Sequence, residues 1–247
     1  MSFLIVEGIR KDGDNIIFDF TQDFKDDIIP LKFQRFNKKL STRFGTNIYF
    51  GYRYNEGHGE DLTFVRDAIK YLDFSKINEN DLKLMIQKAA NNFVKVNGNK
   101  IDLIITPKSS GKLVNYIAKI FKEKLGSNVL LATDVLVKNT VNNIKIDPQK
   151  IDKLNDQQRK NVINAIRSAT KTGSFKMKSI PIPMRRLIID FMTFSNDTTR
   201  QIYNSLSGNI LLLDDIYTGG STFNEMSRII NEYEPQSLTG FVLLLSK

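Results

Sequence analysis

The sequence predicts an α/β fold with a mainly parallel sheet and an α+β N-terminal addition, on three observations. From Ile101 onward, apolar runs of strand length alternate with amphipathic runs of helix length, as in a parallel sheet. Residues 210–213 form an apolar run that ends in two carboxylates and a small-residue turn. Before Ile101, strand-like runs come first and helical runs follow. We therefore expect an addition over 1–98 and a core domain over 99–247.

The composition limits the functions that are open to the chain. Its 247 residues are 41% apolar and 26% charged, as in an ordinary globular protein large enough to bury a core. The absence of cysteine excludes disulfides, thiolate zinc sites and thiol nucleophiles, and the single histidine, His58, cannot form a metal cluster alone. No apolar run approaches the roughly 20 residues of a membrane span, and the N-terminus lacks the basic start of a signal peptide. We expect a cytoplasmic protein with no membrane contact.

The net charge of +9 is concentrated in one stretch. Residues 138–186 contain twelve Lys or Arg and three Asp, so their balance equals that of the whole chain. Such a stretch either covers a polyanionic ligand or contacts a nucleic acid, and both alternatives stay open.

The addition is expected to contain strands over 2–9, 15–20 and 48–54, of which the first two form a hairpin. The aromatic-rich third strand either packs in a small sheet or offers a surface for base stacking. Apolar residues at helical spacing then predict helices over 61–72 and 80–94, the second with Asn78 as its N-cap.

The core is expected to begin with a buried strand over 101–106, an exit turn and a helix over 113–125 that Gly126 ends. After a further strand, a long insertion occupies 134–208. The further strand covers 129–133, and the insertion is expected to contain a helix over 156–169 and a strand over 187–191. A helix over 223–233 and a strand over 237–245 end the core.

The acids after residues 210–213 give the strongest functional signal. In an open parallel sheet, ligands bind beyond the carboxyl ends of the strands, so Asp214 and Asp215 are expected to face a pocket. The small-residue turn that follows lets backbone N–H groups and hydroxyls close around a phosphate at a helix N-terminus. A Mg²⁺ site of a nucleotide triphosphatase is disfavoured because the chain has no G-x-x-x-x-G-K-[ST] loop, whereas a plain strand–turn–helix with solvated acids is the other alternative. The turn consists of Thr218, Gly219, Gly220, Ser221 and Thr222.

Residues 210–222 resemble the signature of the type I phosphoribosyltransferases, which use 5-phosphoribosyl-1-pyrophosphate (PRPP). The segment from Asp214 to Thr222 is most similar to that of ComF-like and orotate-type members. The resemblance covers about residues 101–247 and implies a Rossmann-like core. It implies that Asp214 and Asp215 are catalytic residues that hold the ribose hydroxyls, and that the turn over 218–222 binds the 5-phosphate.

The same resemblance implies two further parts of the site. The exit turn of the first core strand would bind pyrophosphate, although ordinary helix capping also explains its Ser-Ser-Gly sequence. The insertion would close over the substrate as a basic lid, since Gln149, Leu154, Arg159 and Asn161 look similar to a ComF-like segment. The residues of the exit turn are Pro107, Lys108, Ser109, Ser110 and Gly111.

The function implied by the resemblance is transfer of 5-phosphoribosyl from PRPP to a nitrogenous acceptor with release of pyrophosphate, a glycosyltransferase reaction of nucleotide metabolism. Mg²⁺ would arrive bound to PRPP, near Asp214 and Asp215, without a direct protein metal site. Residues 1–98 would form the hood that binds the acceptor. The alternative is a non-catalytic sensor of PRPP or nucleotides, or a nucleic-acid-binding protein with a ComF-like accessory role, on the same fold. The identity of the acceptor and the formation of a homodimer are left open.

Overall fold

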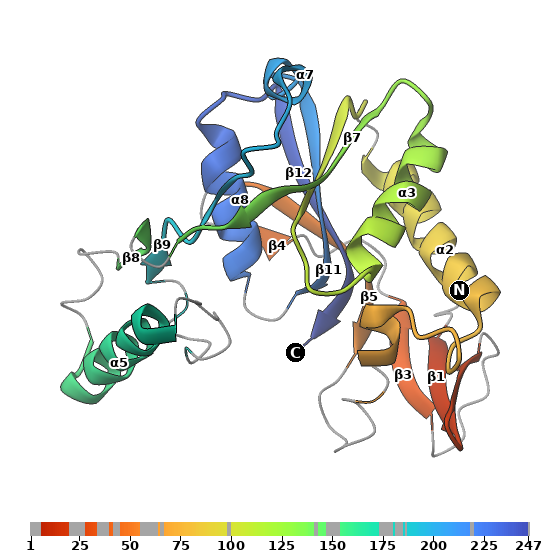
Figure 1. The fold of residues 1–247 in the computed structure, drawn as a ribbon. Helices are drawn as coiled ribbons and strands as arrows, with labels where there is room; N and C mark the ends of the chain where they lie inside the picture. The colour runs from red at the N-terminus through yellow and green to blue at the C-terminus, as the bar shows by residue number, and fades with distance from the viewer. Residues whose placement is uncertain are drawn as a thin grey trace.

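A ten-stranded sheet with helices on both faces forms the centre of the computed structural model (Figure 1). The structure describes residues 6–19, 28–33, 40–41, 45–54, 64, 67–97, 100–140, 143–146, 154–172, 180, 185, 187–217 and 220–246.

Five neighbouring strands of this sheet are parallel. Their central members are buried along most of their length, because helices cover both faces and the strands therefore need continuous apolar runs. The predicted α/β fold with a mainly parallel sheet is confirmed. In spatial order the five strands are β7 (Leu130–Lys138), β6 (Leu103–Pro107), β11 (Asn209–Tyr217), β12 (Ser237–Ser246) and β5 (Asn47–Tyr54).

Antiparallel strands extend the sheet at both edges. β10 (Met192–Phe194) pairs with β7, and at the other edge β5 pairs with β3. The predicted hairpin is present as β1 and β2, which pair around Gly13. Because β5 pairs with β12, the sheet runs continuously across the predicted boundary at residue 98, while the division into domains stays a prediction. The additional strands are β1 (Val6–Asp12), β2 (Asn15–Asp19), β3 (Ile28–Phe33) and β4 (Leu40–Ser41).

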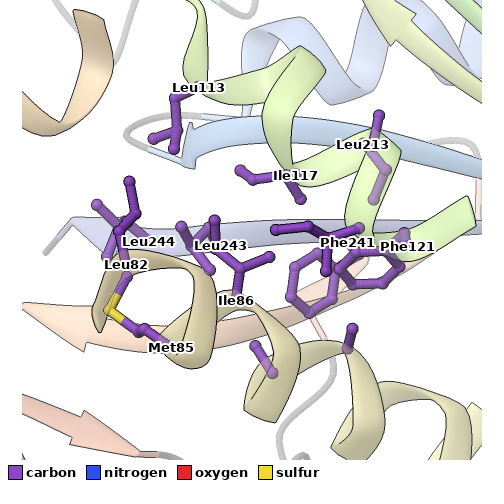
Figure 2. Packing of buried hydrophobic residues seen from close by; sticks show 14 of the residues in the cluster. Leu82, Met85, Ile86, Leu113, Ile117, Phe121, Leu213, Phe241, Leu243 and Leu244 are labelled. Atoms are coloured by element: carbon purple, nitrogen blue, oxygen red, sulfur yellow. The ribbon is translucent and has the colours of Figure 1, made fainter. Parts of the chain in front are cut away.

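The two faces of the sheet carry different helices. α2 (Glu79–Asn97) and α3 (Leu113–Leu125) pack on one face, and α8 (Ser221–Asn231) packs on the other. β11 alternates between them, since Leu211 and Leu213 join the first core cluster whereas Ile210 and Leu212 join the second. Figure 2 shows the first cluster, in which α2 and α3 meet β11 and β12 through Leu82, Met85, Ile86, Leu113, Ile117, Phe121, Leu213, Phe241, Leu243 and Leu244.

The start of α2 agrees with the predicted cap. Asn78 Oδ1 accepts hydrogen bonds from the backbone N–H groups of Asn80, at 2.9 Å, and Asp81, at 3.3 Å. Among the β5 side chains that the structure describes, Tyr49, Phe50 and Tyr52 are buried in the core, so these rings do not offer the surface for base stacking that we considered. Tyr52 also donates its hydroxyl hydrogen bond to the carbonyl of Met85, at 2.8 Å.

The connections reverse direction between β6 and β11. β6 leads through α3 to β7 on one side, and β11 leads through α8 to β12 on the other. Right-handed crossovers in opposite directions require their helices to lie on opposite faces, as α3 and α8 do. The carboxyl ends of β6 and β11 therefore flank a topological switch point, where open α/β sheets bind ligands.

The predicted insertion over 134–208 contributes in part to the main sheet, since β7 continues to Lys138 and β10 pairs with it. The rest of the insertion that the structure describes lies beside the sheet. β8 (Lys145–Ile146) and β9 (Ile188–Ile189) pair as an antiparallel ribbon, and α5 (Asp156–Thr172) lies beyond it (Figure 1). The predicted helix over 156–169 is confirmed and extends by three residues, whereas the predicted strand over 187–191 is only the two-residue β9. α7 (Arg200–Asn204) then leads to β11. No described helix is long and apolar enough to cross a membrane.

Candidate functional site

Two adjacent carboxylates are buried at the end of β11. Asp214 and Asp215 are each 7% exposed. Asp214 Oδ1 accepts the backbone N–H of Asp215 at 2.9 Å, and Asp215 Oδ1 accepts that of Ile216 at 2.8 Å. Asp215 Oδ2 is buried and has no hydrogen-bond partner among the described residues. The end of β11 therefore holds an acceptor oxygen that the described part of the protein leaves unused.

Electrostatics at this pair favour a bound proton. Burial, and then the charge of Asp215, raise the pKa of Asp214 well above its ordinary value, while the positive charge of Lys70 opposes part of the rise. The hydrogen bond from the Asp215 N–H also lowers it. Among the described residues, no cation lies within salt-bridge distance of either carboxylate. Hydroxyl donors or a metal cation would therefore relieve an unfavourable charge here.

The turn after β6 is closed by its own hydrogen bonds. Lys108 N donates to Leu136 O at 2.7 Å, and Gly111 N donates to Ser109 Oγ at 3.1 Å. Within this turn, the N–H groups of Ser109 and Ser110 are the only ones without a hydrogen-bond acceptor among the described residues. The turn predicted to bind pyrophosphate thus keeps two N–H groups for a ligand.

Lys70 joins this turn to the acid pair. Its carbonyl accepts the N–H of Lys112 at 3.0 Å, and its chain crosses the turn at Gly111. A Cβ at Gly111 would lie 2.6 Å from both Cγ and the carbonyl oxygen of Lys70, so the close approach requires glycine. The sequence pattern missed Lys70, because it marked this residue only as the polar side of a predicted helix.

A second missed feature ties β6 to β7 beside the turn. Thr106 Oγ1 accepts the N–H of Asp134 at 3.1 Å and donates to Asn115 Oδ1 at 3.2 Å. Asn115 Nδ2 donates to Asp134 Oδ2 at 2.9 Å. Asp134 has φ +59°, and the strand register shifts between Ile105 and Pro107. The bulge brings a third acid, Asp134, to the carboxyl edge, and no periodicity in the sequence indicates a bulge.

The start of α8 has the form of an anion site. Gly220 is its N-cap with φ +70°, and a Cβ there would collide with the Tyr217 hydroxyl. Among the described residues no side chain caps the helix, and its first turn carries no acid, so within this part of the chain its N–H groups and the positive end of its dipole are available. Ser221 and Thr222 are half-buried in that turn. Thr218 and Gly219 lie outside the described residues.

The predicted site residues therefore fall into three groups. Asp214 and Asp215 lie near the carboxyl end of β11 and the 220–222 segment follows it, while the turn over 107–111 ends the adjacent strand β6, so the topology brings these two groups together. The lid residues form the third group, on and beside α5. Leu154 packs on the second core cluster, Arg159 is half-buried, and Asn161 is exposed. Gln149 and His58 lie outside the described residues.

A charged hollow lies farther along α8. It has a volume of about 410 Å³ and includes Asn143, Lys145, Asp190, Arg228, Glu232 and Tyr233 in its wall. Arg228 follows Ser221 by seven residues, which is roughly 10 Å along a helix. Its charged groups form ion pairs with one another, at 2.7–3.1 Å. This hollow is therefore distinct from the edge that holds Asp214 and Asp215.

No protein-family model matches the chain, and a search of curated proteins finds no match. Membership of the phosphoribosyltransferase family stays a prediction that rests on the residues themselves.

Proposed function

We propose that the protein transfers the 5-phosphoribosyl group of PRPP to a nitrogenous acceptor and releases pyrophosphate. One observation carries the proposal: a buried, uncompensated acid pair lies at the topological switch point of a parallel sheet, between an uncapped helix start and a glycine-dependent turn. Each of these three parts suits one part of PRPP.

The acid pair suits the ribose ring. Carboxylate oxygens accept hydrogen bonds from the 2- and 3-hydroxyls, and Asp215 Oδ2 has an unused acceptor position. As pyrophosphate leaves, positive charge develops at the anomeric carbon. A buried negative charge held nearby by the strand would stabilise that charge without reorganisation. Asp214 and Asp215 are therefore the proposed catalytic residues.

The segments that follow β11 and β6 suit the 5-phosphate and the pyrophosphate of PRPP, respectively. The 5-phosphate would bind the first-turn N–H groups of α8 and the hydroxyls of Ser221 and Thr222. Pyrophosphate would bind Ser109 and Ser110 N–H groups, with positive charge from Lys70, Lys108 and Lys112. Mg²⁺ fits here as a partner of pyrophosphate, because it prefers phosphate oxygens with one or two carboxylates. No group of three or more metal-ligating side chains occurs among the described residues, so PRPP would supply most of the ligands.

The test is turnover by an Asp215→Asn variant. Pyrophosphate release from PRPP–Mg²⁺ is measured against a panel of nucleobases and other nitrogen nucleophiles. Loss of a contact that forms in the transition state predicts a fall of roughly 10²- to 10³-fold in kcat/KM. Asp197→Asn changes an exposed acid in the same way and serves as the control. Near-normal turnover by a folded Asp215→Asn protein would sink the assignment.

A PRPP sensor without turnover is the second candidate, favoured by the turn after β6. The N–H groups of Lys108, Gly111 and Lys112 are bonded within the protein, which leaves fewer donors for a leaving pyrophosphate. A sensor would be stabilised by about 2.7 kcal/mol at 100 times its Kd for PRPP and would release no pyrophosphate with any acceptor. Thermal unfolding with and without PRPP–Mg²⁺, beside the turnover assay, separates the two functions.

A further inference from the structure

The exposed face of α5 carries a line of three cations. Lys160, Arg167 and Lys171 are all exposed and are separated by seven and then four residues. At 3.6 residues per turn they fall within about 40° of one another, and they span roughly 16 Å along the axis. Asn164 is also exposed, between Lys160 and Arg167. The only acid on the helix is Asp156, in its first turn.

This line of cations lies on the side of α5 opposite to its described packing contacts. Val162 is buried on the opposite side of α5, and Ala165 and Ile166 pack against the second core cluster. In Figure 1, α5 lies beyond β8 and β9, apart from the carboxyl end of β11. The packed apolar side fixes the direction of the cationic face, which is therefore held open to solvent.

These three cations of α5 also differ from the cations of β8 and α8. Lys145 and Arg228 form ion pairs with Asp190, so their charge is compensated. Among the described residues, none of Lys160, Arg167 and Lys171 has an ion-pair partner. They also belong to the stretch, residues 138–186, whose balance accounts for the net charge of the whole chain. A polyanion would therefore approach this side of the molecule.

We propose that the exposed face of α5 binds a nucleic acid through its phosphate backbone. Three aligned cations over roughly 16 Å can contact successive phosphates, and Asn164 adds an uncharged hydrogen-bonding group. A membrane surface fits less well. A helix that lies in a membrane interface inserts its apolar side, and the apolar side of α5 is already packed in the protein core.

The test is fluorescence anisotropy with labelled 20-nucleotide single strands and 20-base-pair duplexes of DNA, from 50 to 200 mM salt. The variant combines Lys160→Gln, Arg167→Gln and Lys171→Gln. Removing three phosphate contacts should lower the slope of log K against log salt by about 2–3 and weaken binding at least roughly tenfold at low salt. A stronger effect on one of the two probes identifies the strand form that binds.

The matched control combines Lys83→Gln, Lys95→Gln and Lys119→Gln, which removes the same charge from exposed positions on α2 and α3. It should bind as the unmodified protein does, with both variants retaining its circular dichroism and Tm. Equal losses in the two variants, or no binding of the unmodified protein to either probe at 50 mM salt, would overturn the proposal. Binding to vesicles of anionic phospholipid but not to DNA would also overturn it. These outcomes do not depend on PRPP turnover, so they are separate from the test of the proposed function.

Discussion

Buried acids occur at two places in the unit formed by β11 and α8, and their surroundings differ. At the end of β11, Asp214 and Asp215 are adjacent and have no ion pair among the described residues. Midway along α8, Glu225 is 1% exposed but lies 3.0 Å from the guanidinium of Arg228. Among the described residues, the first group therefore has no ion-pair partner, whereas Glu225 in the second group has one.

The α8 group is built around Arg228. Its Nη2 lies 3.0 Å from Glu225 and 3.1 Å from Asp190, and its Nη1 lies 2.7 Å from Glu232. Burial lowers the pKa of Arg228, but the three carboxylates outweigh burial and raise it. Lys145 adds a second cation through Asp190, at 3.0 Å. These pairs connect α8 to the β8–β9 ribbon, so this group holds the insertion on the sheet.

This difference in ion pairing between β11 and α8 indicates which of the two groups is the better candidate for a functional site. A buried charge with a partner stabilises one arrangement of the chain, whereas a buried charge without one lowers stability and is typical of a functional site. On this comparison, removing a partner at α8 should destabilise the fold, and removing a charge at β11 should stabilise it.

Arg228→Met should give the largest change. It leaves Glu225 buried without its cation, which predicts a loss of about 3 kcal/mol in the free energy of unfolding. Urea denaturation measures the loss, and Arg200→Met, at an exposed arginine of α7, is the control. A loss no greater than that of the control would show that the α8 group does not hold the fold.

Asp214→Asn should have a smaller effect of opposite sign. Asparagine can still accept the N–H of Asp215 but does not ionise, so folding no longer has to place a charge or hold a proton on this buried group. The free energy of unfolding near pH 7 should therefore rise by about 1 kcal/mol. Thermal unfolding across pH measures this gain, with Asp197→Asn as the control.

The pH dependence of that gain follows from the raised pKa. Folded protein holds the Asp214 proton more tightly than unfolded protein does, so the unmodified protein loses stability as the pH rises from about 4 through the folded pKa. The advantage of Asp214→Asn should therefore disappear below about pH 4. A gain that is constant across pH would contradict an origin in the Asp214 charge.

Glu232→Gln should give the smallest change. Its side chain is 60% exposed, and its ion pair with Arg228 joins residues one helical turn apart. Exposed pairs of this kind contribute about 0.3–0.5 kcal/mol, and salt screens them. Tm should fall by roughly 1–2 °C at low salt and by less at high salt. A fall as large as that of Arg228→Met would place Glu232, rather than Glu225, at the centre of the group.

The local parts of the fold and of the candidate site could be predicted from the sequence. The apolar run before Asp214 and the amphipathic run after Gly220 give β11 and α8, because these patterns act over a few residues. The place of β5 in the parallel sheet could not be predicted, since it depends on pairing with a strand far along the chain. Lys70 and Asp134 were missed for a related reason: one reaches the site through a distant turn, and the other through a bulge.

The pairing of β5 with β12 has a consequence for the order in which the chain acquires its fold during synthesis. Asn47 pairs with Thr239, so β5 leaves the ribosome about 190 residues before its parallel neighbour exists. During that interval β5 presents an unpaired edge with the aromatic side chains of Tyr49, Phe50 and Tyr52. Until β12 has been made, this exposed edge is an aggregation hazard of the growing polypeptide. Slower translation would lengthen the time for which a chaperone has to cover it.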